Sequence, residues 1–68
     1  MREVFAVWYF QRGWVVDTCA GGTYSGEECD AMTWPSADEA RAEMKAGDFG
    51  DEGADWEVEK IVEPWKQN

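Results

Sequence analysis

The chain has 68 residues, with fifteen acidic and six basic side chains, so its formal net charge is −9. A charge of this size repels phosphate groups and anionic membrane surfaces, which argues against direct nucleic-acid or membrane binding and favours a basic protein partner. The sequence contains no histidine, which excludes histidine-based acid–base catalysis and histidine metal sites. Five tryptophans, three phenylalanines and two tyrosines argue against an acidic disordered chain, because each ring can bury roughly 150–250 Å² in the core of one small domain.

The first half of the chain predicts a β-hairpin followed by a glycine-rich loop. The segment EVFAVWYF, Glu3–Phe10, is rich in β-branched and aromatic residues and predicts a strand. Residues 11–13 form a short turn, and Trp14–Cys19 predicts the returning strand. The next segment, AGGTYSGEEC, carries three glycines in ten residues and predicts a loop with extended stretches. We expect a short third strand at Ala31–Trp34.

The segment WPSADEARAEMKAG predicts a helix over Ala37–Ala46. Ser36 stands at the N-cap position and Glu39 follows three residues later, which is the capping-box pattern. Gly47 stands just past the last helical residue, where helices commonly end. The stripe expected to face the sheet consists of Ala37, Ala40 and Met44.

The last predicted strand, Trp56–Val62, alternates apolar and acidic residues, which indicates one face in water. Trp56, Val58 and Val62 are expected on one face. Glu57, Glu59 and Glu63 are expected on the other, together with Ile61. Pro64 ends the strand, and residues 64–68 are expected to form a flexible tail of the single domain 1–68.

This order, β-β-(β)-α-β, predicts an α+β fold in which an antiparallel sheet of three to four strands carries one helix on one face. Both faces of the strand 3–10 are apolar, so one helix leaves the second face without cover. Four covers are possible: the tail with Trp65, the loop with Tyr24, a second copy of the chain, or a partner.

The N-terminal segment MREVFAVWYFQRG lacks a long apolar region and a small-residue cleavage site, so we interpret it as a strand and not as a signal peptide. We therefore expect a cytoplasmic protein. Reduced thiols are favoured at Cys19 and Cys29, although a disulfide is geometrically possible if their segments pair as a hairpin. A thiol catalyst is disfavoured, because no histidine can activate it.

The most acidic part of the chain is the segment GDFGDEGADWEVEKIVE, residues 47–63, with seven acids and one lysine. Residues 1–16 carry two arginines and one glutamate, so the charge is unevenly distributed. The acids do not have the spacing of a calcium loop, and no pair of them is marked as catalytic. We therefore expect no metal, no cofactor and no enzyme activity. One interpretation is that the acids only confer solubility.

The other interpretation is a surface that binds a basic partner. Its expected residues are Asp48, Asp51, Glu52, Asp55, Glu57, Glu59 and Glu63, with Glu27 and Glu28 as a second patch and Tyr24 and Trp65 as aromatic anchors.

In length, in charge, in the run DFGDEGADWEVE and in its sheet-plus-helix layout, the chain resembles the small acidic proteins with which bacteriophages disarm host nucleic-acid machinery. Anti-CRISPR proteins and DNA-mimic inhibitors of restriction enzymes and of uracil-DNA glycosylase belong to this class. The resemblance implies stoichiometric, non-catalytic inhibition, in which the protein occupies a DNA- or RNA-binding groove of a complex such as a CRISPR effector. The alternative is a small homodimeric adaptor or housekeeping module that uses the apolar face of the first hairpin.

Overall fold

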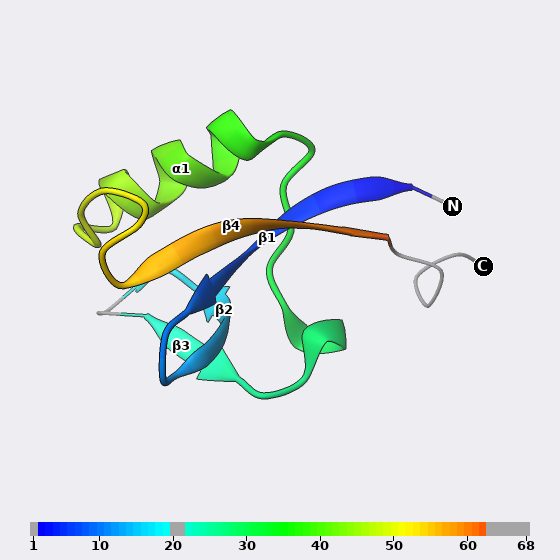
Figure 1. Ribbon diagram of the computed structural model, residues 1–68, viewed down its shortest axis with the longest axis horizontal. Coiled ribbons are helices and arrows are strands. Elements are labelled where there is room, and N and C mark those ends of the chain that lie inside the picture. Colours follow the sequence, from blue (N-terminus) through cyan, green and yellow to red (C-terminus); the bar gives the residue numbers. More distant parts are fainter. Residues whose placement is uncertain (1, 20–21, 63–68) are drawn as a thin grey trace.

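The computed structural model describes residues 2–19 and 22–62 and shows an α+β fold (Figure 1). A four-stranded antiparallel sheet has the strand order β3-β2-β1-β4, and one helix lies across one of its faces. This confirms the predicted fold class. Residues 64–68, predicted as a tail, lie outside the described residues. The elements are β1 (Glu3–Tyr9), β2 (Gly13–Asp17), β3 (Thr23–Ser25), a short 3-10 helix η2 (Glu28–Asp30), α1 (Ala37–Ala46) and β4 (Trp56–Val62).

The helix α1 has the bounds that its capping residues predict. The Ser36 hydroxyl accepts a hydrogen bond from the backbone N–H of Glu39 at 3.2 Å and donates one to the Glu39 carboxylate at 3.0 Å. At the other end, the N–H of Gly47 donates to the carbonyl of Glu43. These local bonds satisfy backbone groups that a helix end leaves unpaired, so the sequence alone is enough to place both ends.

The third strand was predicted in the wrong place. It lies at Thr23–Ser25, inside the segment predicted as a loop with extended stretches. The segment 31–34 forms only an isolated bridge, in which Trp34 and Phe5 exchange two backbone hydrogen bonds of 2.8 Å. Its Met32 N–H also donates to the carbonyl of Val15 in β2, at 2.9 Å. The segment therefore bonds to both β1 and β2, whose own pairing is confined to the residues nearest the turn.

Strand β2 ends two residues earlier than the sequence predicts. The carboxylate of Asp17 accepts a hydrogen bond from the N–H of Cys19 at 2.9 Å, a local bond typical of turns that Asp initiates. At its other end, Gly13 has a φ of +116°, and a β-carbon there would lie 2.5 Å from the carbonyl oxygen of Ser25. Only glycine fits this close approach of β3 to the start of β2.

The helix-side core joins the sheet to α1. Its buried residues are Val7, Val15, Trp34, Ala40, Met44 and Trp56. Trp56 is completely buried, and its indole N–H donates to the carbonyl of Phe49 at 3.2 Å. Phe49 lies between α1 and β4 and packs against the same cluster. This contact ties the acidic loop between α1 and β4 to the core.

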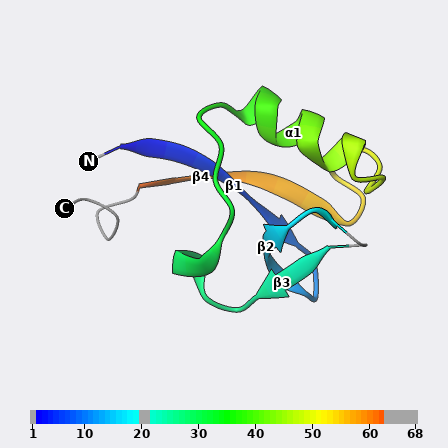
Figure 2. The same cartoon turned by 180° about the vertical axis from the view of Figure 1, so that it is seen from behind.

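The sheet face opposite α1 has its own small core, formed by Val4, Ala6, Ala31 and Ile61. Ala31 directly follows η2, and Figures 1 and 2 both show the segment with η2 on the side of the sheet away from α1. This segment therefore covers part of the second face. Tyr24 does not, because it packs against the helix-side core. No helix within residues 2–19 and 22–62 is long and apolar enough to cross a membrane.

Candidate partner-binding surface

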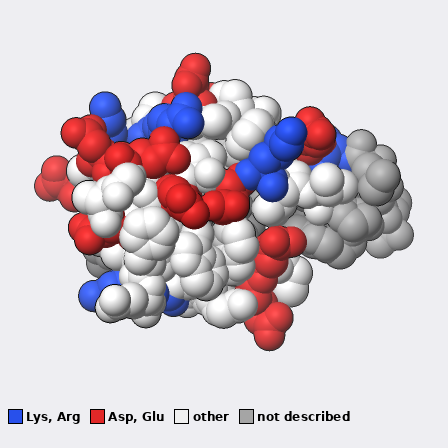
Figure 3. Space-filling model, viewed as in Figure 1, with Lys and Arg blue, Asp and Glu red and all other residues white. Residues whose placement is uncertain are grey.

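The structure separates the acids that were predicted to form one surface. Asp51 and Glu52 lie beside the helix, Asp48 and Asp55 line a hollow near Arg12, and β4 carries two acids on the opposite face of the sheet. Glu27 precedes η2 and Glu28 begins it, and both are exposed. Glu63 and Trp65 lie outside the described residues. Figure 3 shows Lys and Arg side chains among the acids near the helix, and an uncharged area that separates these acids from others lower in the view.

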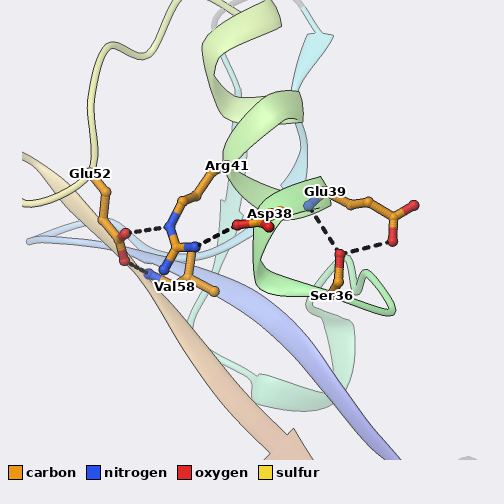
Figure 4. A network of polar contacts seen from close by, with 6 residues as sticks. All are labelled: Ser36, Asp38, Glu39, Arg41, Glu52 and Val58. Atoms are coloured by element: carbon orange, nitrogen blue, oxygen red, sulfur yellow. Dashed lines mark hydrogen bonds and ion pairs between the residues drawn. The ribbon is translucent and has the colours of Figure 1, made fainter.

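Beside the helix, the acids of the loop 48–55 are paired with basic residues of α1. Glu52 accepts a hydrogen bond from the Arg41 guanidinium at 2.7 Å and another from the backbone N–H of Val58 at 2.8 Å (Figure 4). Arg41 also contacts Asp38 at 3.1 Å, and Lys45 contacts Asp51 at 3.2 Å. Local ion pairs thus offset part of the charge of this loop, and Glu52 fastens the loop to both α1 and β4.

Replacing Glu52 with alanine is expected to lower the free energy of unfolding by about 1 kcal/mol, since it removes two charge-assisted hydrogen bonds at a partly exposed site. Both bonds hold the pKa of Glu52 below its ordinary value of 4.5, and the hydrogen bond from the Val58 N–H has the larger effect. A carboxyl group whose pKa is lowered in the folded state stabilises the fold at higher pH. The loss of unfolding free energy in the alanine variant is therefore expected near neutral pH, and it shrinks as the pH falls through the lowered pKa of Glu52.

Urea unfolding at several pH values measures this effect, and Asp51→Ala is the matched control. Asp51 belongs to the same loop, but its side chain is 86% exposed and its ion pair with Lys45 is worth only about 0–1 kcal/mol. Equal destabilisation by the two variants would show that Glu52 has no special role in holding the loop.

A hollow of about 670 Å³ lies at the end of the sheet near the first turn. The guanidinium carbon of Arg12 lies 5.6 Å from the ring centre of Tyr24 and 5.9 Å from that of Tyr9. Arg12 therefore covers the ring of Tyr24 that was predicted to anchor a partner. Asp48 and Asp55 line the same hollow, so their charge also lies close to a cation of the chain itself.

The face opposite α1 has a different composition. Trp8 and Trp14 are cross-strand neighbours, and their rings meet edge to face with centres 5.1 Å apart. Glu57 is paired with Trp8 across β1 and β4, and Glu59 is paired with Ala6, so both acids lie on this face beside the tryptophans. In the described part of the chain, Glu57 and Glu59 form no ion pair with Lys or Arg.

We name this surface the acid–aromatic face and define it by Trp8, Trp14, Glu57 and Glu59. Both tryptophans are half-buried, so part of each ring is accessible. The face combines accessible aromatic area with carboxylates that no described lysine or arginine neutralises, a composition suited to a basic partner.

The two acids of β4 influence each other. The pKa of Glu59 is raised above its ordinary value of 4.5, first by a hydrogen bond with the Glu57 carboxyl group and further by partial burial and by the charge of Glu57. A raised pKa in the folded state means that this pair stabilises the fold most at low pH. The contribution is complete below 4.5 and is lost as the pH rises through the raised value.

Replacing Glu57 with glutamine removes the carboxyl group that raises the pKa of Glu59, first through its hydrogen bond and further through its charge. The variant is therefore expected to have a lower Glu59 pKa and a more stable fold at neutral pH. NMR titration of the Glu59 side-chain carboxyl carbon measures the pKa directly. Glu28→Gln is the control, since Glu28 lies on η2 and not beside Glu59 on β4. An unchanged Glu59 pKa in Glu57→Gln would contradict the coupling.

Other candidate chemistry is sparse. Cys19 and Cys29 are both exposed and do not form a disulfide. A hydrogen bond to the Asp17 carboxylate, with the charge of that group, raises the pKa of the Cys19 thiol, which lowers its reactive thiolate fraction. Among residues 2–19 and 22–62, no group of three or more Cys, Asp or Glu side chains is arranged to hold a metal ion.

Trp8 and Trp14 were not among the surface residues expected from the sequence. A signal was present, because a turn of residues 11–13 makes them cross-strand partners and the alternation in 56–62 puts Glu57 and Glu59 on one face. The pairing of β4 with β1 brings the tryptophan pair and the two glutamates together on one face, and the sequence did not reveal that pairing. Comparison of the chain with protein-family models, curated proteins and solved structures found no match.

Proposed function

We propose that the protein is a non-catalytic inhibitor that occupies a basic nucleic-acid-binding groove of a host defence complex in the bacterial cytoplasm. The observation that supports this proposal is the acid–aromatic face, where Glu57 and Glu59 lie beside the Trp8–Trp14 pair. The chain as a whole has a net charge of −9, so it approaches a cationic groove under long-range attraction.

Each component of the face has a counterpart in such a groove. Arginine side chains that bind phosphates can pair with carboxylates in the same bidentate geometry, and their guanidinium planes can stack on tryptophan rings. A CRISPR effector is one suitable complex, because its guide–target duplex lies in a positively charged channel. The acids beside α1 contribute less to this binding, since Arg41 and Lys45 already pair with them.

A pull-down from bacterial lysate with the tagged protein tests the proposal. We expect basic nucleic-acid-binding proteins to be retained at low salt, to elute as the salt concentration rises, and to be displaced by DNA or RNA that competes for the same groove. Capture that neither salt nor competing nucleic acid affects would overturn the proposal.

The second candidate function is a homodimeric adaptor that uses the apolar face of the first hairpin. The accessible Trp8–Trp14 pair favours it, as does Phe10, which is 37% exposed at the hairpin turn. Sedimentation at low and high salt separates the two candidates. A stable dimer at both salt concentrations favours the adaptor, whereas a monomer favours the inhibitor, because a net charge of −9 per copy opposes self-association.

A further inference from the structure

Strand β4 forms one edge of the sheet, and two contacts reveal which of its backbone groups point outward. The N–H of Val58 donates to the Glu52 carboxylate at 2.8 Å, and the carbonyl of Trp56 accepts from the N–H of Gly53 at 2.8 Å. These groups point away from β1. Because backbone direction alternates along an antiparallel strand, the N–H and C=O groups of Lys60 and Val62 also point outward.

The opposite side of β1 supports this assignment. Phe5, which faces Lys60 in the β1–β4 register, exchanges its two backbone hydrogen bonds with Trp34 and not with β4. The Phe5–Lys60 pair is therefore a non-hydrogen-bonded pair of the ladder, and the backbone groups of Lys60 are directed to the open edge.

The edge has a covered half and an open half. The loop with Glu52 and Gly53 pairs with the first half, and Arg41 holds the Glu52 carboxylate in place at 2.7 Å. Beyond it, no described residue pairs with the outward groups of Lys60 and Val62. Because Glu52 occupies the N–H of Val58, the accessible part of the edge begins at the carbonyl of Val58 and continues through Lys60 to Val62.

We propose that this open half of β4 binds an extended segment of the partner as an additional antiparallel strand, in which basic residues alternate with apolar ones. The proposal rests on the proposed function, since it assumes that the partner is basic. Strand addition to an exposed sheet edge is a common mode of peptide recognition, in which main-chain hydrogen bonds provide affinity and alternate side chains provide specificity.

The side chains of β4 specify this alternation. On the acid–aromatic face, Glu57 and Glu59 would lie directly opposite the basic residues of the added strand. On the helix side, Val58 and Val62 would lie opposite its apolar residues, and Val62 is 40% exposed there. Lys60 points to the helix side and contacts Glu3 at 3.8 Å, so its charge is directed away from the basic residues.

A second copy of the chain fits the same edge less well. Its net charge of −9 is repelled by an identical chain, and it brings no basic strand to Glu57 and Glu59. Charge complementarity therefore favours a basic partner as the occupant.

The test uses a short synthetic peptide in which arginine and valine alternate, capped at both ends. Valines of an antiparallel strand would lie opposite Val58, Lys60 and Val62, so their N–H groups would bond to β4, whereas those of the arginines would point away. Two modified peptides are then compared with it: the first is N-methylated at the valine amides, and the second is N-methylated at the arginine amides. We expect the first modification to weaken binding at least about tenfold and the second to have little effect.

Hydrogen exchange at the Lys60 amide is the second measurement, with at least about tenfold slower exchange expected in the presence of excess peptide. Equal effects of the two N-methylated peptides, or an unprotected Lys60 amide, would overturn strand addition. The proposed function would survive that result if the pull-down of basic proteins still responds to salt and to competing nucleic acid. A second copy at the edge would appear as Lys60 protection that depends on protein concentration without peptide, and this also counts against the proposal.

Discussion

Replacing Trp56 with alanine is expected to remove roughly a third or more of the protein's free energy of unfolding. Trp56 is completely buried between the sheet and α1, and removing a buried tryptophan side chain costs about 3–5 kcal/mol. At about 0.05–0.15 kcal/mol per residue, a chain of 68 residues has only roughly 3–10 kcal/mol of stability in total. The loss also frees the carbonyl of Phe49, to which the indole N–H donates.

Urea unfolding followed by circular dichroism measures this effect, with two further variants for comparison. Trp8→Ala removes an equally large side chain from a half-buried position, so we expect a smaller loss, below about 2 kcal/mol. Trp56→Phe keeps an aromatic ring but not the hydrogen bond to Phe49, and it should fall between the wild-type protein and Trp56→Ala. A cooperative transition in Trp56→Ala with a midpoint close to that of the wild type would contradict this account of the core.

The parts of the fold that could be predicted from the sequence are those that local interactions determine. The capping pair Ser36 and Glu39 lies within one turn of helix, and the alternation in Trp56–Val62 lies within one strand, so both elements have the predicted bounds. The third strand was misplaced because Thr23–Ser25 is short and follows glycines, and because 31–34 bonds to two strands without joining a ladder. Only tertiary contacts decide between these two segments.

In the candidate site, too, the sequence predicted the features that depend on local geometry and not those that depend on tertiary contacts. The period of two in β4 correctly grouped Glu57 with Glu59, since that grouping needs only the geometry of a strand. The sequence could not show that Arg41 would reach Glu52, eleven residues away, or that Lys45 would reach Asp51. A count of charges along the chain therefore overestimated the acidic surface, because it treated paired and unpaired carboxylates alike.

The acids on the two sides of the sheet have different roles, because Glu52 lies beside α1 whereas Glu57 and Glu59 lie on the acid–aromatic face. Glu52 caps the edge of β4 and holds the loop, so reversing its charge would disturb the fold together with any binding surface. Glu57 and Glu59 support no such contact with the rest of the described chain. They can therefore be changed to test binding without weakening the fold.

The double variant Glu57→Gln with Glu59→Gln is expected to weaken binding to a basic groove at least about tenfold at low salt, which corresponds to about 1.4 kcal/mol. Glutamine has nearly the shape of glutamate, so the strand and the Trp8–Trp14 pair should be preserved. The variant has a net charge of −9 + 2 = −7. Titration calorimetry or surface plasmon resonance against a partner recovered from the pull-down measures the affinity, and circular dichroism verifies the fold.

The matched control is Glu39→Gln with Glu43→Gln, which reaches the same net charge of −7 through two exposed residues on α1. Glutamine at position 39 can still take part in the capping box with Ser36, so the helix should remain intact. We expect this control to lose less than about threefold in affinity, because only the long-range attraction is weakened. If both double variants lose affinity equally, the partner responds to total charge alone, and binding does not take place at the acid–aromatic face.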